Sequence, residues 1–177
     1  MLRNIFLITL IVVTFCWGSV MAAEDQAEQK PEINVRFLYF YCNDVDEVRE
    51  FYTNTLGMIE QSYMNDEEWG WLMYQSDGLQ IVIMRAPQEV PVHEEWAPQP
   101  GWGGGELPIP SWSIHVPEAK FAGIVKQLND GGYKVHDTKP MWAQDSYWSF
   151  PVKDPMGNTV EVYTSPAERP ESTDWPE

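Results

Sequence analysis

One carboxylate near the end of the chain lies in a setting where it could take part in chemistry. Residues 159–164 alternate the apolar Val160 and Val162 with polar side chains, which predicts a β-strand with one apolar and one polar face. Glu161 lies on the polar face, which in an antiparallel sheet often faces water. If this face instead lines a cavity, the carboxylate needs a partner, a bound ligand or a raised pKa. Glu161 is then the polar anchor of a binding site or a general base.

Aromatic side chains are the second feature that points to a site. In the strand expected from residue 35 to residue 42, Phe37, Tyr39 and Tyr41 fall on one face. The chain has nine tryptophans, more than a small core generally uses, and an aromatic-lined cavity is the usual form of a small-molecule site. We therefore predict a cavity for an apolar or aromatic molecule that carries a hydrogen-bonding or cationic group. For any single aromatic residue, packing in the core is the simpler interpretation.

Two similar successions of elements would position these residues. The first occupies residues 35–85: a strand at 35–42, a helix that starts after Asn43-Asp44 and ends at Gly57, and strands at 58–64, 69–75 and 79–85. The second occupies residues 111–164: a strand at 111–116, a helix from Pro117 to Gly131, and strands at 133–138, 147–152 and 159–164. Such an internal repeat indicates two modules of one design.

The segment between the modules, residues 86–110, breaks the pattern. It is rich in proline and glycine and contains Trp96 and Trp102. Connections of this length are commonly lids or linkers, so the two tryptophans either close over the site or form a surface for a protein partner. After the second module, residues 165–177 form an acidic, proline-rich tail.

The N-terminus and the net charge limit where the protein acts and what it binds. Residues 1–22 have Arg3, an apolar run and small residues at the end, the pattern of a cleaved signal peptide, and residues 23–34 read as a flexible lead-in. We expect an exported protein, periplasmic or secreted, with no stable membrane insertion after cleavage and with Cys42 as its one remaining cysteine. The formal charge of −16 argues against nucleic acid as a partner.

The repeat and two motifs carry a family resemblance. Phe51-Tyr52 followed by Leu56-Gly57-Met58 stands in the first module, and Asp154-Pro155-Met156-Gly157-Asn158 followed by Val160-Glu161-Val162 stands in the second. The chain resembles the vicinal oxygen chelate superfamily, which includes glyoxalase I, bleomycin-resistance proteins and extradiol dioxygenases. The resemblance implies an α+β fold in which two βαβββ modules form a curved mixed sheet around a shared cavity, with the helices outside. It is compatible with a homodimer, since related folds close the cavity within one chain or across two.

The resemblance also implies four metal-ligand positions, one on each of four inward-facing strands. In this sequence they fall at Phe37, Val82, Ser111 and Glu161, with Trp112 in place of Ser111 if the register moves by one. Only Glu161 is a usual metal ligand, so we expect no metal cofactor. The alternative is a rebuilt site for a divalent metal, with Glu161, His115 and His93 as ligands.

The leading prediction is an exported glyoxalase-like and bleomycin-resistance-like domain that binds a small organic molecule without metal. The alternatives are a metal-dependent lyase or dioxygenase at the rebuilt site, and a metal-free lyase or isomerase with Glu161 as base and Tyr39 or His115 as acid. The fold by itself does not rank these reactions. The predicted ligand-binding residues are Phe37, Tyr39, Tyr41, Ser111, His115, Trp148 and Glu161.

Overall fold

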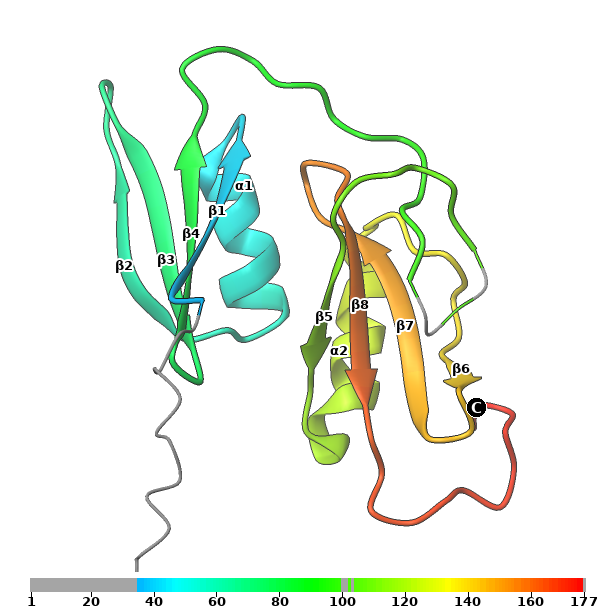
Figure 1. The fold of residues 1–177 in the computed structure, drawn as a ribbon. Helices are drawn as coiled ribbons and strands as arrows, with labels where there is room; N and C mark the ends of the chain where they lie inside the picture. The colour runs from blue at the N-terminus through cyan, green and yellow to red at the C-terminus, as the bar shows by residue number, and fades with distance from the viewer. Residues whose placement is uncertain (1–34, 100–101, 103, 177) are drawn as a thin grey trace, which may run out of the picture. The chain divides into compact units, whose positions relative to one another are not determined.

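The computed structural model describes residues 35–99, 102 and 104–176. The predicted signal peptide and lead-in lie outside the described residues. From Val35 onward the chain forms one compact unit, and no helix in its described part is long and apolar enough to span a membrane. Its elements are β1 (Phe37–Cys42), α1 (Val45–Arg49), the π-helical η1 (Glu50–Thr55), β2 (Glu60–Asn65), β3 (Gly70–Ser76), β4 (Leu79–Arg85), β5 (Trp112–His115), α2 (Glu118–Asp130), β6 (Met141–Ala143), β7 (Tyr147–Lys153) and β8 (Thr159–Thr164) (Figure 1).

The strands form two four-stranded mixed sheets of the same topology. The strand order is β1-β4-β3-β2 in the first sheet and β5-β8-β7-β6 in the second. β1 pairs in parallel with β4, and β5 pairs in parallel with β8. The other neighbouring strands are antiparallel. The predicted α+β fold of two βαβββ modules is therefore confirmed.

Local sequence signals place the first helix. The Asp44 side chain accepts hydrogen bonds from the backbone N–H groups of Asp46 and Glu47, so it is the N-cap of α1. The chain leaves η1 through Gly57, whose φ of 74° suits glycine better than other residues. Both ends of the helix were predicted. Asn43 instead exchanges two 2.8 Å hydrogen bonds with the Val90 backbone, which anchors the start of the segment between the modules.

The helix-facing sides of the two sheets contribute to one core. The core contains Phe51 from η1, Leu128 from α2 and Val162 from β8, all almost fully buried. Residues of the two modules also contact each other directly. The ring centres of Phe40 and Trp112 lie 4.6 Å apart. The sheet faces that are turned away from the helices do not belong to this core.

The second strand of the second module differs from its prediction. Residues 133–138 do not form a strand; Val135 makes one isolated bridge to Val152, and the edge strand resumes only at β6, where Met141 pairs with Ser149. The interruption is a turn in which Asp137 Oδ1 accepts a hydrogen bond from the backbone N–H of Lys139. Pro140 follows the turn and has no N–H to donate, so a continuous ladder cannot form here.

Candidate functional site

Glu161 lies in a cluster of hydroxyl groups on the face of the second sheet that is turned away from α2. Ser113 Oγ donates to Glu161 Oε2 at 2.6 Å, because β5 and β8 place these two residues directly opposite each other. Ser149 Oγ and Tyr147 OH, both from β7, donate to Glu161 Oε1 at 2.6 Å and 3.2 Å. Glu161 is only 4% exposed. We call these four residues the Glu161 cluster.

The Glu161 cluster satisfies its carboxylate within the chain. Three hydroxyl donors replace the water that the buried carboxylate has lost. Burial and the nearby charge of Glu161 raise the pKa of Tyr147 to about 12, so its phenol remains a donor at neutral pH. We expected a ligand to bond to Glu161, but its carboxylate already accepts three hydrogen bonds from the chain.

The residues at the family's metal-ligand positions do not fit a divalent ion. In the first sheet Tyr39 pairs with Val82 as Ser113 pairs with Glu161 in the second, so Val82 takes the place of Glu161. Neither Val82 nor Phe37 has a donor atom. Ser111 uses its hydroxyl to donate to the Pro98 carbonyl oxygen at 3.2 Å.

The rebuilt metal site is not assembled either. In the described part of the chain no group of three or more His, Cys, Asp or Glu side chains could hold a metal ion. The His115 ring is exposed and packs 5.3 Å from the ring of Tyr163. His93 lies against the β7–β8 turn, where its backbone N–H donates to the Met156 carbonyl oxygen.

Part of the segment between the modules covers one end of the same face. Lys153 Nζ donates to the backbone oxygens of Glu95 at 2.7 Å and Gly157 at 2.6 Å, and the Trp96 ring lies over the ammonium at 4.8 Å. Burial is the main cause that lowers the pKa of Lys153. Ala97 N donates to Thr159 Oγ1 at 2.8 Å.

Both tryptophans of that segment pack on the second module. The Trp102 ring lies 4.2 Å from the His136 ring and 5.6 Å from the ring of Trp96. The segment therefore covers the Lys153 end of the sheet face that also carries Glu161.

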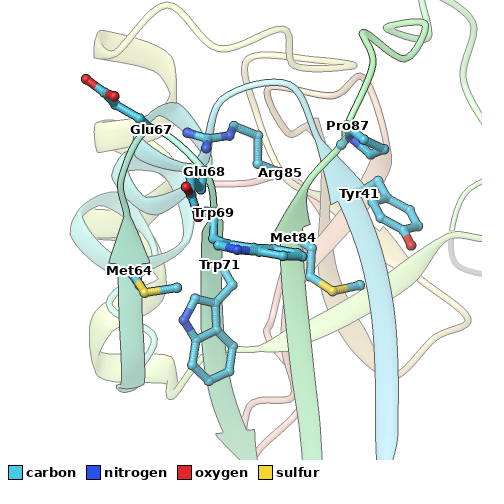
Figure 2. Close-up of a pocket in the computed structure, with 11 residues that line it drawn as sticks. Tyr41, Met64, Glu67, Glu68, Trp69, Trp71, Met84, Arg85 and Pro87 are labelled. Atoms are coloured by element: carbon cyan, nitrogen blue, oxygen red, sulfur yellow. The ribbon is translucent and has the colours of Figure 1, made fainter.

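The first module carries a pocket of about 700 Å³ on the face turned away from its helix. Its floor is a row of side chains from all four strands. Strand pairing places Met64 of β2 opposite Trp71 of β3, Trp71 opposite Met84 of β4, and Met84 opposite Tyr41 of β1. Figure 2 shows the two methionine sulfurs on either side of the Trp71 ring. We call this site the Trp71 pocket.

The hairpin between β2 and β3 forms the rim of the Trp71 pocket. It contributes Glu67, Glu68 and Trp69, and the Trp69 side chain is 68% exposed (Figure 2). Arg85 also lines the pocket, but its Nη1 donates to Asn65 Oδ1 at 2.8 Å and its Nη2 to the Asp66 carbonyl oxygen at 2.7 Å. These bonds tie the guanidinium to the hairpin and hold the rim in place.

The predicted aromatic face of β1 is present, but only one of its members lines the pocket. Phe37, Tyr39 and Tyr41 point to the same side, are about half exposed, and the first two rings are stacked at 5.9 Å. Tyr41 alone belongs to the Trp71 pocket. Met64, Trp71 and Met84 were not among the predicted ligand-binding residues. Strand alternation would have placed them on one face once the order of the strands was known.

Trp148 does not share a sheet face with Glu161. It lies on the helix-facing side of β7, buried, with the rings of Trp142 and Trp175 at 5.1 Å and 4.9 Å. Its neighbour Ser149 points to the opposite side and bonds to Glu161, because successive side chains of a strand alternate between the faces. The alternation of Trp148 with Phe150 and Val152 was the signal that would have placed it in the core.

The fold is that of two βαβββ modules, and the second module has an acidic residue, Glu161, at one of the four metal-ligand positions of the family. The chain belongs to the Glyoxalase/Bleomycin resistance protein/Dioxygenase superfamily, whose family model matches residues 35–162. No match was found among curated proteins.

Solved structures of the same superfamily share the fold. A glyoxalase/dioxygenase from Nostoc punctiforme is 16% identical with a TM-score of 0.54, over 84% of this chain and 98% of that chain. A glyoxylase/bleomycin resistance protein/dioxygenase domain from Frankia sp. EAN1pec is 15% identical with the same TM-score of 0.54, over 76% and 98%. A glyoxalase family protein from Enterococcus faecalis is 14% identical with a TM-score of 0.51, over 73% and 96%. At these identities the likeness shows the fold alone.

Proposed function

We propose that this protein binds a small organic molecule in the Trp71 pocket and does so without a metal ion. The observation that carries the proposal is the cross-strand row of Met64, Trp71, Met84 and Tyr41 beneath a pocket of about 700 Å³. This volume lies within the usual range for small-molecule sites, and a flat apolar floor suits an aromatic or hydrocarbon body. Methionine side chains adapt to ligands of different outline.

The charged groups at the rim favour a ligand with a positive or hydrogen-donating group. Glu67 and Glu68 are exposed carboxylates, while the guanidinium of Arg85 donates to the hairpin. A cation over the Trp69 or Trp71 ring gains about 0.5–2 kcal/mol. The formal charge of −16 attracts cations to the protein surface. The ligand class we propose is therefore an organic cation with an aromatic or apolar body.

The residues at the family's metal-ligand positions support binding without metal. Glu161 accepts three hydroxyl hydrogen bonds, and Phe37 and Val82 stand where a chelating member needs ligands. A rebuilt centre would require at least two further donors to converge on Glu161.

We also propose that the protein is exported, as the first 22 residues suggest. Expression of the full chain in a bacterial host, followed by fractionation and intact mass measurement, tests this. We expect a periplasmic or secreted product that begins near Ala23. An uncleaved product in the cytoplasm would overturn the proposal.

The binding proposal is tested by calorimetric titration of the chain from Ala23 with matched sets of ligands. Each set contains one aromatic body carrying an ammonium, a neutral hydroxyl or a carboxylate group. We expect at least one ammonium member to bind, and the carboxylate members to bind much more weakly. Trp71→Leu should abolish binding, whereas Trp142→Leu, a change of another half-buried strand tryptophan, should leave it intact.

A second pair of variants isolates the role of charge. Replacing Glu67 and Glu68 together by glutamine should weaken the ammonium ligand by about 3- to 10-fold and leave the neutral ligand unchanged. The control replaces Glu47 and Glu89, which are exposed but do not line the pocket, and keeps the net charge equal. Equal losses in both pairs would mean a general charge effect. Binding that survives Trp71→Leu would place the ligand elsewhere.

A further inference from the structure

A second hollow lies on the other side of the second sheet, where the C-terminal tail returns across α2. It has a volume of about 330 Å³, at the small end of the range for small-molecule sites. It shares no lining residue with the Trp71 pocket, and it lies on the opposite face of the sheet from Glu161. We call it the tail pocket.

Three aromatic rings form its apolar wall. Trp175 of the tail packs edge-on against Phe121 of α2, with ring centres 5.5 Å apart, and against Trp148 of β7, with ring centres 4.9 Å apart. Trp175 is only partly buried, and it lines the tail pocket together with the other two rings. An indole cluster of this kind supplies both apolar contact and ring faces that attract cations.

One buried hydroxyl in the wall has no partner. Thr164 lines the tail pocket and is 1% exposed, and its Oγ1 makes no hydrogen bond within the described part of the chain. Nearly all buried polar side-chain atoms in proteins have a partner, and a hydroxyl both donates and accepts. A ligand with a hydrogen-bond donor would satisfy Thr164 Oγ1.

The charges around the tail pocket are of one sign. Glu118 at the start of α2 and Asp174 of the tail both line it, and none of the described residues that line it is basic. The pocket therefore favours a positively charged molecule over an anion. An ammonium group can donate to Thr164 Oγ1 while its apolar body contacts the rings.

We propose that the tail pocket is a second binding site, for a small primary ammonium compound with an apolar body. The ammonium donates to Thr164 Oγ1, the carboxylates of Glu118 and Asp174 balance its charge, and the rings of Trp148 and Trp175 pack against the body. This site is separate from the Trp71 pocket, and the proposal does not depend on the function assigned there.

The test follows the indole N–H signals of nitrogen-15-labelled protein during titration with benzylammonium, with benzyl alcohol as the neutral analogue. The signals of Trp148 and Trp175 are assigned from single phenylalanine variants. We expect benzylammonium to shift both signals to saturation, and the alcohol to bind about 10-fold more weakly or not at all. The same titration in Trp71→Leu should leave these shifts unchanged, which distinguishes this site from the Trp71 pocket.

Two variants test the polar contacts. Thr164→Val keeps the side-chain shape and should weaken the binding of benzylammonium about 5-fold. Thr173→Val, the same substitution at an exposed position of the tail, should have no effect. Glu118→Gln combined with Asp174→Asn, both at exposed positions, should weaken it further without loss of folding. Unshifted Trp148 and Trp175 signals, equal binding of the alcohol, or unchanged affinity in Thr164→Val would each overturn the proposal.

Discussion

The phenol of Tyr52 donates a 2.9 Å hydrogen bond to Asp154 Oδ2, and this buried bond joins the helix of the first module to the β7–β8 turn of the second. Asp154 also accepts the backbone N–H groups of Met156 and Asn158, each at 2.9 Å. Burial raises the pKa of Asp154, and burial with the nearby carboxylate raises that of Tyr52 well above its ordinary value. The two motifs that carried the family resemblance therefore meet in one bond.

Removing the phenol of Tyr52 should destabilise the protein more than a matched change at the surface. We expect Tyr52→Phe to lower the free energy of unfolding by about 1–3 kcal/mol, because it leaves a buried carboxylate short of a donor. Tyr63→Phe, whose phenol bonds Asp46 at an exposed site, should cost about 0.5 kcal/mol or less. Urea unfolding measures both. Equal losses would mean that the buried bond between the modules adds no more to stability than the bond at the surface.

The turn after β7 should not tolerate any side chain at Gly157. Its φ is 73°, and a Cβ there would lie 2.0 Å from the His93 carbonyl oxygen. Gly132 has the same φ of 73°, but a Cβ at that position would have no atom within 4 Å, so Gly132→Ala reports backbone strain alone, about 1–2 kcal/mol. We expect Gly157→Ala to cost clearly more, measured as a lower thermal midpoint. Similar midpoints would show that the segment around His93 can move aside.

The ionisation of Tyr147 should depend on Glu161. The pKa of Tyr147 rises from 10.0 to about 12, so this phenol contributes stability below pH 10 that is lost as the pH rises through 12. At pH 11 only about a tenth of Tyr147 should be ionised, read as the difference in tyrosinate absorbance between the wild type and Tyr147→Phe. Glu161→Gln removes the charge but not the burial, so it should increase that fraction without reaching the ordinary value. An unchanged fraction would contradict the role of Glu161.

Metal content should not depend on Glu161. We expect the chain from Ala23, purified without chelator, and its Glu161→Ala variant to hold the same metal, well below one ion per chain, by elemental mass spectrometry. The reason is the donor set, in which Phe37 and Val82 cannot coordinate and Glu161 is bonded by three hydroxyls. About one ion per chain in the wild type, lost in the variant, would establish a metal site at Glu161.

The elements themselves were largely predictable because their signals are local. The helix that starts at Asp44 and leaves through Gly57 is defined by a capping side chain and by a backbone angle that suits glycine. The hairpin between β3 and β4 turns through Asp77 and Gly78, which both adopt positive φ. The alternation of side chains along a strand correctly placed Phe37, Tyr39 and Tyr41 together on one face of β1.

Arrangements that depend on distant partners were not predictable. Strand periodicity shows which side chains share a face, but not which strand lies beside which. Met64, Trp71 and Met84 became the floor of a pocket only through the pairing of β2, β3 and β4. In the same way, Trp175 of the tail packs on Phe121 and Trp148, residues far from it in sequence.

Some properties of Glu161 follow from the sequence, and others follow only from the tertiary structure. By itself the sequence determined that this carboxylate shares the polar face of a strand and occupies a family ligand position. The tertiary structure decided its partners, because β5 brings Ser113 opposite it and β7 brings Tyr147 and Ser149 alongside. A buried carboxylate needs hydrogen-bond donors in place of water, and the neighbouring strands decide which donors lie close to it. Here three hydroxyl groups lie within hydrogen-bonding distance of Glu161.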